Sequence, residues 1–308
     1  MQRRILASVS GGKDSGAMAL WLLEQGLEIE AVFLDTGWEH PATYDYLRST
    51  LAGAIGEITW LRPERSMSEL VLHKSMFPSR ARRFCTADLK LAPFEAHIAS
   101  YPPGTVVNVI GVRADESRAR AGLPRWSCED GNRVFVDTWR PLIAWREDDV
   151  FAIHARHGLS LNPLYAHGAA RVGCWPCIYA RRAEIRRLAE IDPGRIEHIR
   201  QLERDVGSTF FYDRGGRGAT CIDEVVAWAR AGAGAGDESD ERFDPGEGNR
   251  GCMRWGLCDL ATPEAPDHDE RVQAQRARAP HAGGAPPAGD DALAWAARGY
   301  RLQLEGHA

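Results

Sequence analysis

The sequence predicts an α/β fold in which a parallel sheet carries helices on both of its faces. Apolar runs at residues 3–9 and 29–34 each precede a helix-like segment, and this repeated order requires right-handed crossovers between parallel strands. A glycine-rich turn at residues 10–15 joins the first strand to the first helix. The chain has 308 residues, 44% of them hydrophobic, so we expect two domains, or one domain with appendages.

Hydrophobic periodicity and turn residues place the other elements. Gly158 is a stop signal for the helix before it. Because ligands bind beyond the carboxyl ends of parallel strands, we expect the turns after the first two strands to lie side by side. Strands are expected at 3–9, 29–34, 58–61, 105–110 and 133–137, and helices at 16–25, 43–51, 147–157, between 178 and 206, and ending near Tyr101.

The composition changes near residue 231, where Ala-Gly alternation leads into an acidic run. Such a segment is typical of a flexible linker, and the Ala-, Pro- and Gly-rich residues beyond it are typical of disorder, apart from a short helix expected at 291–304. We therefore expect an α/β domain at 1–160 that carries the glycine-rich turn, a cysteine-containing helical region at 161–230, an acidic linker at 231–251, and a Cys pair with a mostly disordered tail at 252–308.

Charge and cysteine content narrow the class of protein. No apolar run approaches bilayer length and the N-terminus lacks a signal-peptide pattern, so we expect a cytoplasmic protein without a membrane segment. A net charge of -5 argues against extensive binding of nucleic-acid phosphates, although arginines are dense between residues 113 and 187. The seven cysteines favour metal or redox chemistry over disulfides.

The glycine-rich turn has the features of a phosphate-binding site. Two glycines allow a ligand to approach the backbone, and the N–H groups that open the next helix face an anion. Lys13 adds a mobile positive charge. The spacing differs from that of a P-loop, and the alternative is a simple strand-to-helix turn with a solvated lysine. The predicted nucleotide-binding residues here are Ser8, Ser10, Gly11, Gly12, Lys13, Asp14 and Ser15.

Two further turns follow predicted strands. Asp35 and Thr36 end the second strand, where a carboxylate could hold the Mg²⁺ of a bound ATP. After the strand at 105–110, Gly111 permits close approach of a ligand, and arginines offer planar forks for phosphate or sulfate. In both places the alternative is a solvated surface turn. The predicted binding residues of the later turn are Gly111, Arg113, Glu116 and Arg120.

Cysteines form two candidate sites. Cys85 lies among positive charges that include Lys90, which suits a nucleophile or a metal ligand; an inert buried thiol is the alternative. Cys174 and Cys177 have the Cys-x-x-Cys spacing that binds one metal, and Cys252 with Cys258 could complete four sulfur ligands, Cys85 being the alternative supplier. The metal centre would be an iron–sulfur cluster or zinc, and a structural or redox dithiol is the other reading.

Together these motifs resemble the phosphoadenosine phosphosulfate reductase family over residues 3–190. The string Ser10-Gly11-Gly12-Lys13-Asp14-Ser15 is similar to the PP-loop of ATP pyrophosphatases, and the resemblance implies a Rossmann-like adenine nucleotide alpha-hydrolase fold. The block from Asn162-Pro163-Leu164-Tyr165 to Cys174 and Cys177 resembles the segment of adenylylsulfate reductases that holds a 4Fe-4S cluster.

The chain also departs from the reductases. It lacks their C-terminal Glu-Cys-Gly-x-His motif, has Cys85-Thr86 in place of a Cys-Cys pair, and keeps an intact PP-loop. These features resemble the ATP-using sulfurtransferase branch. The resemblance implies cleavage of ATP, with Mg²⁺, to AMP and pyrophosphate in the service of sulfur transfer, and candidate catalytic residues Lys13, Asp14, Asp35, Cys85 and Lys90.

Two alternative functions and several partners are also consistent with the sequence. One alternative is thiol-dependent reduction of phosphoadenylyl or adenylyl sulfate to sulfite, and the other is a nucleotide-binding regulator without turnover. The partners would be an adenine nucleotide, a sulfur donor protein or small thiol, and a nucleic acid as one candidate acceptor.

Overall fold

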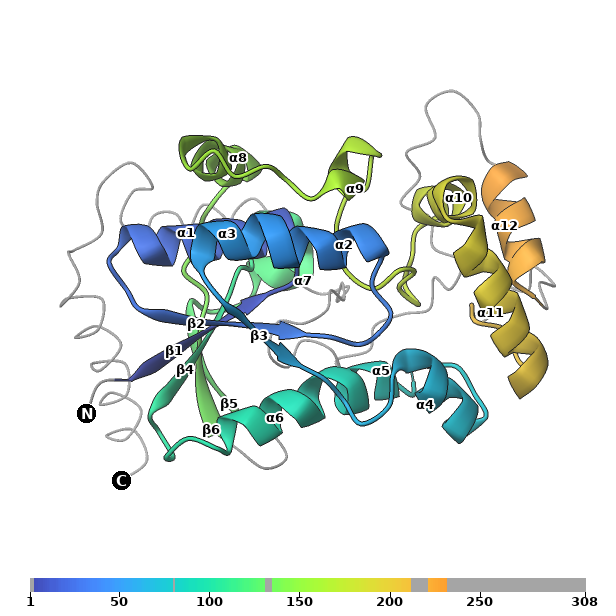
Figure 1. Cartoon of the computed structure of the whole chain (residues 1–308), viewed down its shortest axis with the longest axis horizontal. Helices are drawn as coiled ribbons and strands as arrows, with labels where there is room; N and C mark the ends of the chain where they lie inside the picture. Colours follow the sequence, from blue (N-terminus) through green and yellow to red (C-terminus); the bar gives the residue numbers. More distant parts are fainter. Residues whose placement is uncertain (1–2, 80, 131–134, 212–220, 232–308) are drawn as a thin grey trace.

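The computed structural model describes residues 3–79, 81–130, 135–211 and 221–231. Within these ranges, six strands form one sheet in the order β3-β2-β1-β4-β6-β5 (Figure 1). Neighbouring strands are parallel except for β5, which runs antiparallel to β6 at the edge. The predicted α/β fold is therefore confirmed, while the edge strand β5 was not predicted. The strands are β1 (Arg4–Val9), β2 (Ile29–Leu34), β3 (Ile58–Leu61), β4 (Val106–Ile110), β5 (Trp126–Asp130) and β6 (Phe135–Trp139).

β1 lies in the middle of the sheet and is buried on both sides. Ala7 belongs to the core on the α1 side, and its neighbour Leu6 belongs to the core on the α6 side. Because successive residues of a strand point to opposite faces, a strand covered on both faces needs an unbroken apolar run. This requirement explains the sequence Ile5-Leu6-Ala7 and fixes the direction in which β1 delivers the turn that follows it.

One face of the sheet is covered by α1, by the helical segment from α2 to α3, and by α8 (Figure 1). The segment expected as a helix at 43–51 extends from 41 to 55 and includes a wider π-helical turn. α1 begins at Lys13, earlier than the predicted residue 16, directly after the glycines. These helices are α1 (Lys13–Glu24), α2 (Pro41–Asp45), η1 (Tyr46–Leu51), α3 (Ala52–Ile55) and α8 (Glu147–Arg156).

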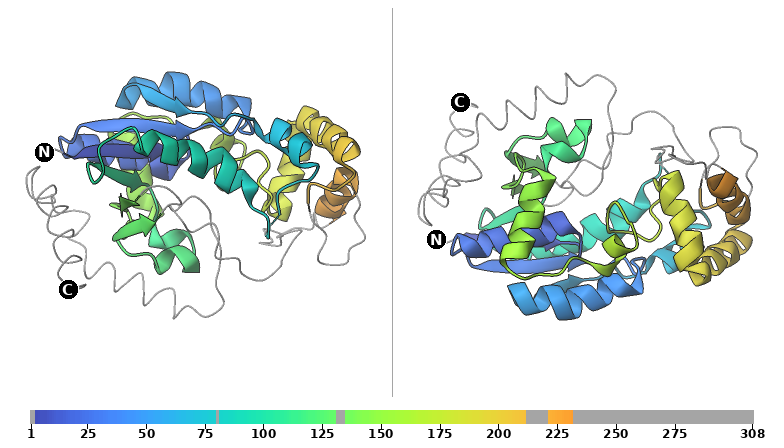
Figure 2. Two further views of the ribbon diagram at one scale, coloured as in Figure 1. Left: turned by 90° about the horizontal axis from the view of Figure 1, so that it is seen from below. Right: turned by 90° about the horizontal axis from the view of Figure 1, so that it is seen from above.

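The opposite face is covered by α6, and α4 and α5 continue from it toward one end of the sheet (Figures 1 and 2). α4 was not predicted, although a capping box marks its start: the Ser66 and Glu69 side chains each accept from the other's backbone N–H group. These elements are α4 (Met67–Lys74), α5 (Phe84–Thr86), η2 (Ala87–Leu91) and α6 (Ala92–Ile98).

A second core lies beyond one end of the sheet, where α10, α11 and α12 pack together with α4 (Figure 2). Trp38 and Phe210 are almost fully buried there, and their rings stack with centroids 5.9 Å apart. The Arg-rich helices expected between 178 and 206 are present, whereas α12 was not predicted. The remaining elements are η3 (Ala114–Glu116), α7 (Arg118–Ala121), α9 (Pro163–Ala166), α10 (Arg182–Ile191), α11 (Pro193–Val206) and α12 (Ile222–Ala231).

The predicted linker, disordered tail and helix at 291–304 lie outside the described residues, apart from Ala231 at the end of α12. The domain boundaries stay predictions. Among the described helices, none combines the length and the apolar composition that crossing a bilayer requires.

Candidate functional site

A cavity of about 250 Å³ opens at the carboxyl ends of β1 and β4, where parallel sheets place their ligands. The turn after β1, the residues after β4 and the segment from α9 to α10 form its walls. Many of the predicted site residues therefore meet in one place. Those lining the cavity are Ser8, Ser10, Gly12, Asp14, Ser15, Lys90, Gly111, Glu116, Arg120, Cys174 and Cys177, whereas Gly11, Lys13, Asp35, Thr36, Cys85 and Arg113 are not among the described residues that line it.

The turn after β1 is held in shape by its own serines. The Ser10 N–H donates to Ser15 Oγ at 3.1 Å, and that hydroxyl donates to the Gly12 carbonyl at 3.0 Å. Gly11 has φ +74°, a conformation that favours glycine. The N–H groups of Asp14 and Ser15 belong to the first turn of α1, where the helix itself supplies no acceptor. The turn therefore places the first N–H groups of α1 where the sequence predicts a phosphate-binding site, and anion binding there stays a prediction.

Gly111 permits β4 to approach this turn. A Cβ atom at residue 111 would lie 2.5 Å from the Asp14 carbonyl oxygen and 2.9 Å from the Cα of Ser15. Contacts that short do not occur, so only glycine fits while the turn keeps its position. The requirement for Gly111 is thus steric, and it concerns the turn as much as a ligand.

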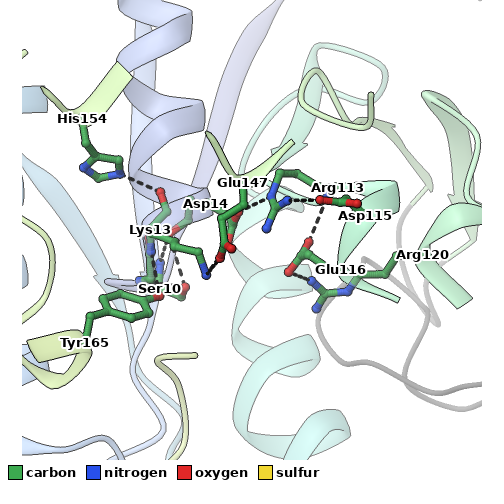
Figure 3. Close-up of polar contacts among 12 residues, drawn as sticks. Ser10, Lys13, Asp14, Arg113, Asp115, Glu116, Arg120, Glu147, His154 and Tyr165 are labelled. Carbon is green, nitrogen blue, oxygen red and sulfur yellow. Dashed lines mark hydrogen bonds and ion pairs between the residues drawn. The ribbon is translucent and has the colours of Figure 1, made fainter. Parts of the chain in front are cut away.

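The later turn joins the first through a chain of charges (Figure 3). The Arg113 guanidinium is 4% exposed and donates from Nε to Asp14 Oδ1, and Glu116 Oε2 accepts from the Arg113 N–H at 2.8 Å. Arg120 pairs with the other oxygen of Glu116. Burial raises the pKa of Glu116, and the Asp14 carboxylate adds to the rise while Arg120 opposes it. Arg113 thus orients the Asp14 carboxylate that lines the cavity.

Residues of α8 and α9 contact both the side chain and the backbone of Lys13. Its Nζ lies 3.2 Å from Glu147 Oε1 and 5.2 Å from the centre of the Tyr165 ring, and its backbone N–H donates to the Tyr165 hydroxyl at 3.0 Å. The His154 Nε2 lies 2.8 Å from the Lys13 carbonyl oxygen, within a buried hydrogen bond. Figure 3 shows these side chains converging on the start of α1.

Sequence reasoning did not assign these contacts. Asn162 and Tyr165 were recognised as part of a family block, but nothing in the sequence connects them to a turn about 150 residues earlier. Asn162 donates from Nδ2 to the Gly11 carbonyl at 3.3 Å. Glu147 and His154 read only as the first and a later residue of an amphipathic helix.

The turn after β2 differs from expectation in how its carboxylates are used. Asp35 Oδ1 accepts from the Tyr44 hydroxyl at 2.9 Å, and Asp35 Oδ2 accepts from Arg62 Nε at 2.9 Å. Glu39, by contrast, lines the cavity while its carboxylate accepts from Thr36 and Tyr44. The structure therefore brings Glu39 to the cavity and commits Asp35 to contacts within the fold.

The described cysteines approach one another without forming a complete metal site. Cys174 and Cys177 line the cavity together with Lys90. Burial raises the pKa of the Cys174 thiol to about 12. The positive charge of Lys90 opposes this rise, whereas the negative charges of Glu39, Cys177 and Cys85 add to it. Among the described residues, no group of three or more His, Cys, Asp or Glu side chains has the geometry to hold a metal ion. Cys252 and Cys258 lie outside the described residues, so the thiols present supply only part of a four-ligand set.

The relatives found by comparison with known sequences include uncharacterized proteins and adenosine 5′-phosphosulfate reductases. A 37.8 kDa protein of Escherichia phage 186, described as uncharacterized, is 34% identical over 261 residues, which cover 67% of this chain and 78% of the phage protein. The adenosine 5′-phosphosulfate reductase of Streptomyces coelicolor is 31% identical, and the match covers 48% of this chain and 61% of the enzyme. A protein of Methanocaldococcus jannaschii is 29% identical, with 61% of this chain and 45% of that protein covered.

Among solved structures, phosphoadenylyl-sulfate reductase from Candida auris in complex with phosphate is 20% identical with a TM-score of 0.44, over 56% of this chain and 81% of that one. FMN adenylyltransferase from Candida glabrata has a TM-score of 0.42 at 17% identity, over 56% of this chain and 55% of that one. The sequence model of the phosphoadenosine phosphosulfate reductase domain matches residues 4–180, which include the whole sheet and the Cys-x-x-Cys segment. The chain belongs to the phosphoadenosine phosphosulfate reductase domain family.

Proposed function

We propose that the protein is an ATP-dependent adenylating enzyme that cleaves ATP to AMP and pyrophosphate in the service of sulfur transfer. The observation that carries the proposal is the intact turn after β1: Ser10, Gly12, Asp14 and Ser15 all line one cavity at the carboxyl ends of β1 and β4. Backbone donors at a helix N-terminus beside a glycine-rich turn are suited to a phosphate chain.

In the proposed reaction an acceptor oxygen attacks the α-phosphorus of ATP. The bond from that phosphorus to the bridging oxygen breaks, and pyrophosphate leaves with the bonding electron pair. The first N–H groups of α1 and the Lys13 ammonium would stabilise the charge that grows on the leaving group. A sulfur donor then displaces AMP from the activated acceptor.

Bound Mg²⁺ would neutralise charge on the phosphate chain. Carboxylate oxygens are its preferred protein ligands, and Asp14 and Glu39 are the candidates among the residues that line the cavity, although each also accepts hydrogen bonds within the fold. Asp35, the ligand proposed from the sequence, is bound by Tyr44 and Arg62, so it would have to leave these partners to reach a metal.

Basic side chains of the cavity also support an anionic substrate. Lys90, Arg171 and Arg187 are among its lining residues, and the Arg187 guanidinium has no hydrogen-bond or ion-pair partner among the described residues. Arg187 packs against the backbone of Gly168, whose lack of a side chain leaves space for the guanidinium. A guanidinium that lines a cavity in this way is well placed to bind a negative group.

The test is pyrophosphate release from ATP by protein purified without oxygen. Lys13→Ala should lower the rate by about 100- to 1000-fold with an unchanged melting temperature, since one preorganised donor is lost. Lys74→Ala is the matched control, because Lys74 of α4 is a lysine paired with an acidic side chain, Asp88 of η2, that does not line the cavity. Equal rates for wild type and Lys13→Ala would contradict the proposal.

A second candidate function is thiol-dependent reduction of adenylyl sulfate or its 3′-phosphorylated form. Its support is the presence of Cys174 and Cys177 in the same cavity as the phosphate-binding turn, together with relatives named as adenosine 5′-phosphosulfate reductases. Release of sulfite from either sulfonucleotide, without pyrophosphate from ATP, would select this function. Binding of ATP without any product would instead select a regulatory protein.

We also propose that Cys174 and Cys177 ligate a metal centre, completed by Cys252 and Cys258 or by Cys85. An iron–sulfur cluster is the first candidate and zinc the alternative. Iron, sulfide and zinc analysis of the full chain tests this proposal, with Cys174→Ala compared with Cys221→Ala. A metal content that Cys174→Ala leaves unchanged would contradict it.

A further inference from the structure

Lys13 does not reach the cavity in this structure. Its side chain is 8% exposed, and its ammonium is held between Glu147 Oε1 at 3.2 Å and the face of the Tyr165 ring (Figure 3). Asp14 Oδ2 is farther away, at 3.8 Å. The closest anionic atom to the ammonium is thus supplied by α8, and it lies outside the phosphate-binding turn.

Among the described residues, the Glu147 side chain makes no ion pair other than the one with Lys13. It is the first residue of α8, and the start of that helix is capped by Asp149, which accepts from the Arg146 N–H at 2.7 Å. The side chain of Glu147 is 53% exposed, so water can solvate the carboxylate when Lys13 leaves. Release of the pair therefore requires no rearrangement of the core.

We infer that Glu147 is a positioning residue that holds Lys13 in a waiting position and competes with the phosphate chain of the nucleotide for its ammonium. The inference rests on the proposed function, because it assumes that Lys13 turns toward a phosphate. The cavity does not include Lys13, so its ammonium, 3.2 Å from Glu147 Oε1, would have to move away from that carboxylate to reach a phosphate chain on the turn. Glu147 thereby weakens nucleotide binding without taking part in the bound state.

The predicted consequence is a gain of affinity, which damage to the fold would not produce. Equilibrium binding of ATP to Glu147→Gln should be about threefold tighter than to wild type, because a partly exposed ion pair that stabilises only the free protein is lost. The KM for ATP should fall by a similar factor while kcat stays unchanged. Asp148→Asn removes the same charge from the neighbouring, exposed residue of α8 and should change the affinity by less than about 1.5-fold.

A second measurement tests the contact in the absence of nucleotide. The rate at which an acylating reagent labels Lys13, followed by mass spectrometry, should be higher in Glu147→Gln than in wild type, because a lysine side chain that no carboxylate holds in a buried position is reached by the reagent more often. Labelling in Asp148→Asn should match wild type.

The outcomes separate this inference from the proposed function. If wild-type protein binds ATP and Glu147→Gln binds it equally well or more weakly, the inference is wrong and the ATP site stands. If labelling of Lys13 is the same in Glu147→Gln and wild type, the contact is not formed in solution and the inference is wrong. If neither protein binds ATP or inorganic pyrophosphate, the proposed function is wrong and the inference falls with it.

Discussion

The helices α1 and α8 are joined by an ion pair at each end, and the two pairs differ in their surroundings. At the start of both helices, Lys13 meets Glu147 beside the cavity, with the Lys13 side chain almost fully buried. At their other ends, Glu24 accepts from Arg156 Nε at 2.7 Å and lies 2.8 Å from His157 Nε2, and the Arg156 side chain is 54% exposed. The inner contact thus joins a buried lysine to a half-exposed glutamate, and the outer contact joins two partly exposed side chains.

The comparison shows that the distance of an ion pair from the carboxyl end of β1 decides whether the pair can affect the cavity. Water can replace the outer pair, which therefore contributes little beyond joining two helices. The inner pair lies where β1 ends. The side chains of Asp14, Tyr165 and His154 each contact Lys13 there. Substitutions at the cavity end of α1 should therefore alter nucleotide binding, whereas those at the far end should leave it unchanged.

The largest expected effect is that of Asp14→Asn. The substitution removes the closest charged partner of the buried Arg113 guanidinium and leaves Asp115 at 3.3 Å, and breaking a buried pair in this way costs about 3 kcal/mol. Urea denaturation measures the loss, and pyrophosphate release should fall with it. Asp115→Asn, which removes the weaker and more exposed partner of the same guanidinium, should cost less than about 1 kcal/mol. Similar losses in the two variants would contradict the assignment of Asp14 as the main partner.

Gly111→Ala should have the next largest effect and lower the free energy of unfolding by about 2 kcal/mol, because the new methyl group would overlap the backbone of Asp14 and Ser15. ATP binding should be lost as the turn shifts. Gly53→Ala is the matched control, since nothing lies within 4 Å of a Cβ there and its site is helical; it should be neutral or stabilising. Retention of ATP affinity in Gly111→Ala would show that the turn can move without harm.

Asp35→Asn sharpens the contrast between the turns after β1 and β2. The Tyr44 hydroxyl keeps Glu39 as an acceptor and Arg62 is largely exposed, so the loss of stability should be about 1 kcal/mol. Pyrophosphate release should fall much less than in Asp14→Asn. Asp45→Asn, at an exposed position of α2, provides the control, and an equal loss of turnover in the Asp14 and Asp35 variants would restore Asp35 as a metal ligand.

Glu24→Gln should have the smallest effect. It should lower the free energy of unfolding by about 0.5 kcal/mol, since solvent screens this surface pair. The hydrogen bond from Arg156 lowers the pKa of Glu24 below its ordinary value of 4.5 despite some burial. A lowered pKa in the folded state means that the pair stabilises the protein above pH 4.5 and that this contribution is lost as the pH falls through the folded value. Wild type and variant should therefore have equal stability at low pH and in high salt, as followed by thermal unfolding.

Much of the fold followed from local patterns. The strands at 29–34 and 58–61 were predicted with the observed bounds, because each is a short, mainly apolar segment rich in residues that favour strands. β5 was missed because its sequence, Trp-Ser-Cys-Glu-Asp, has no apolar alternation after Trp126 and becomes a strand only through its pairing with β6. α12 was missed because its apolar face has meaning only against α10 and α11.

The sequence by itself determined the α/β fold, the identity of the turn after β1 and the residues that open α1, since these depend on neighbours in the chain. Only the tertiary structure decided that Tyr165 and Glu147 engage Lys13, that Arg113 orients Asp14, and that Glu39 rather than Asp35 lines the cavity. The physical reason is that side-chain contacts between distant segments depend on how the helices pack on the sheet, and no spacing within the sequence encodes such distances.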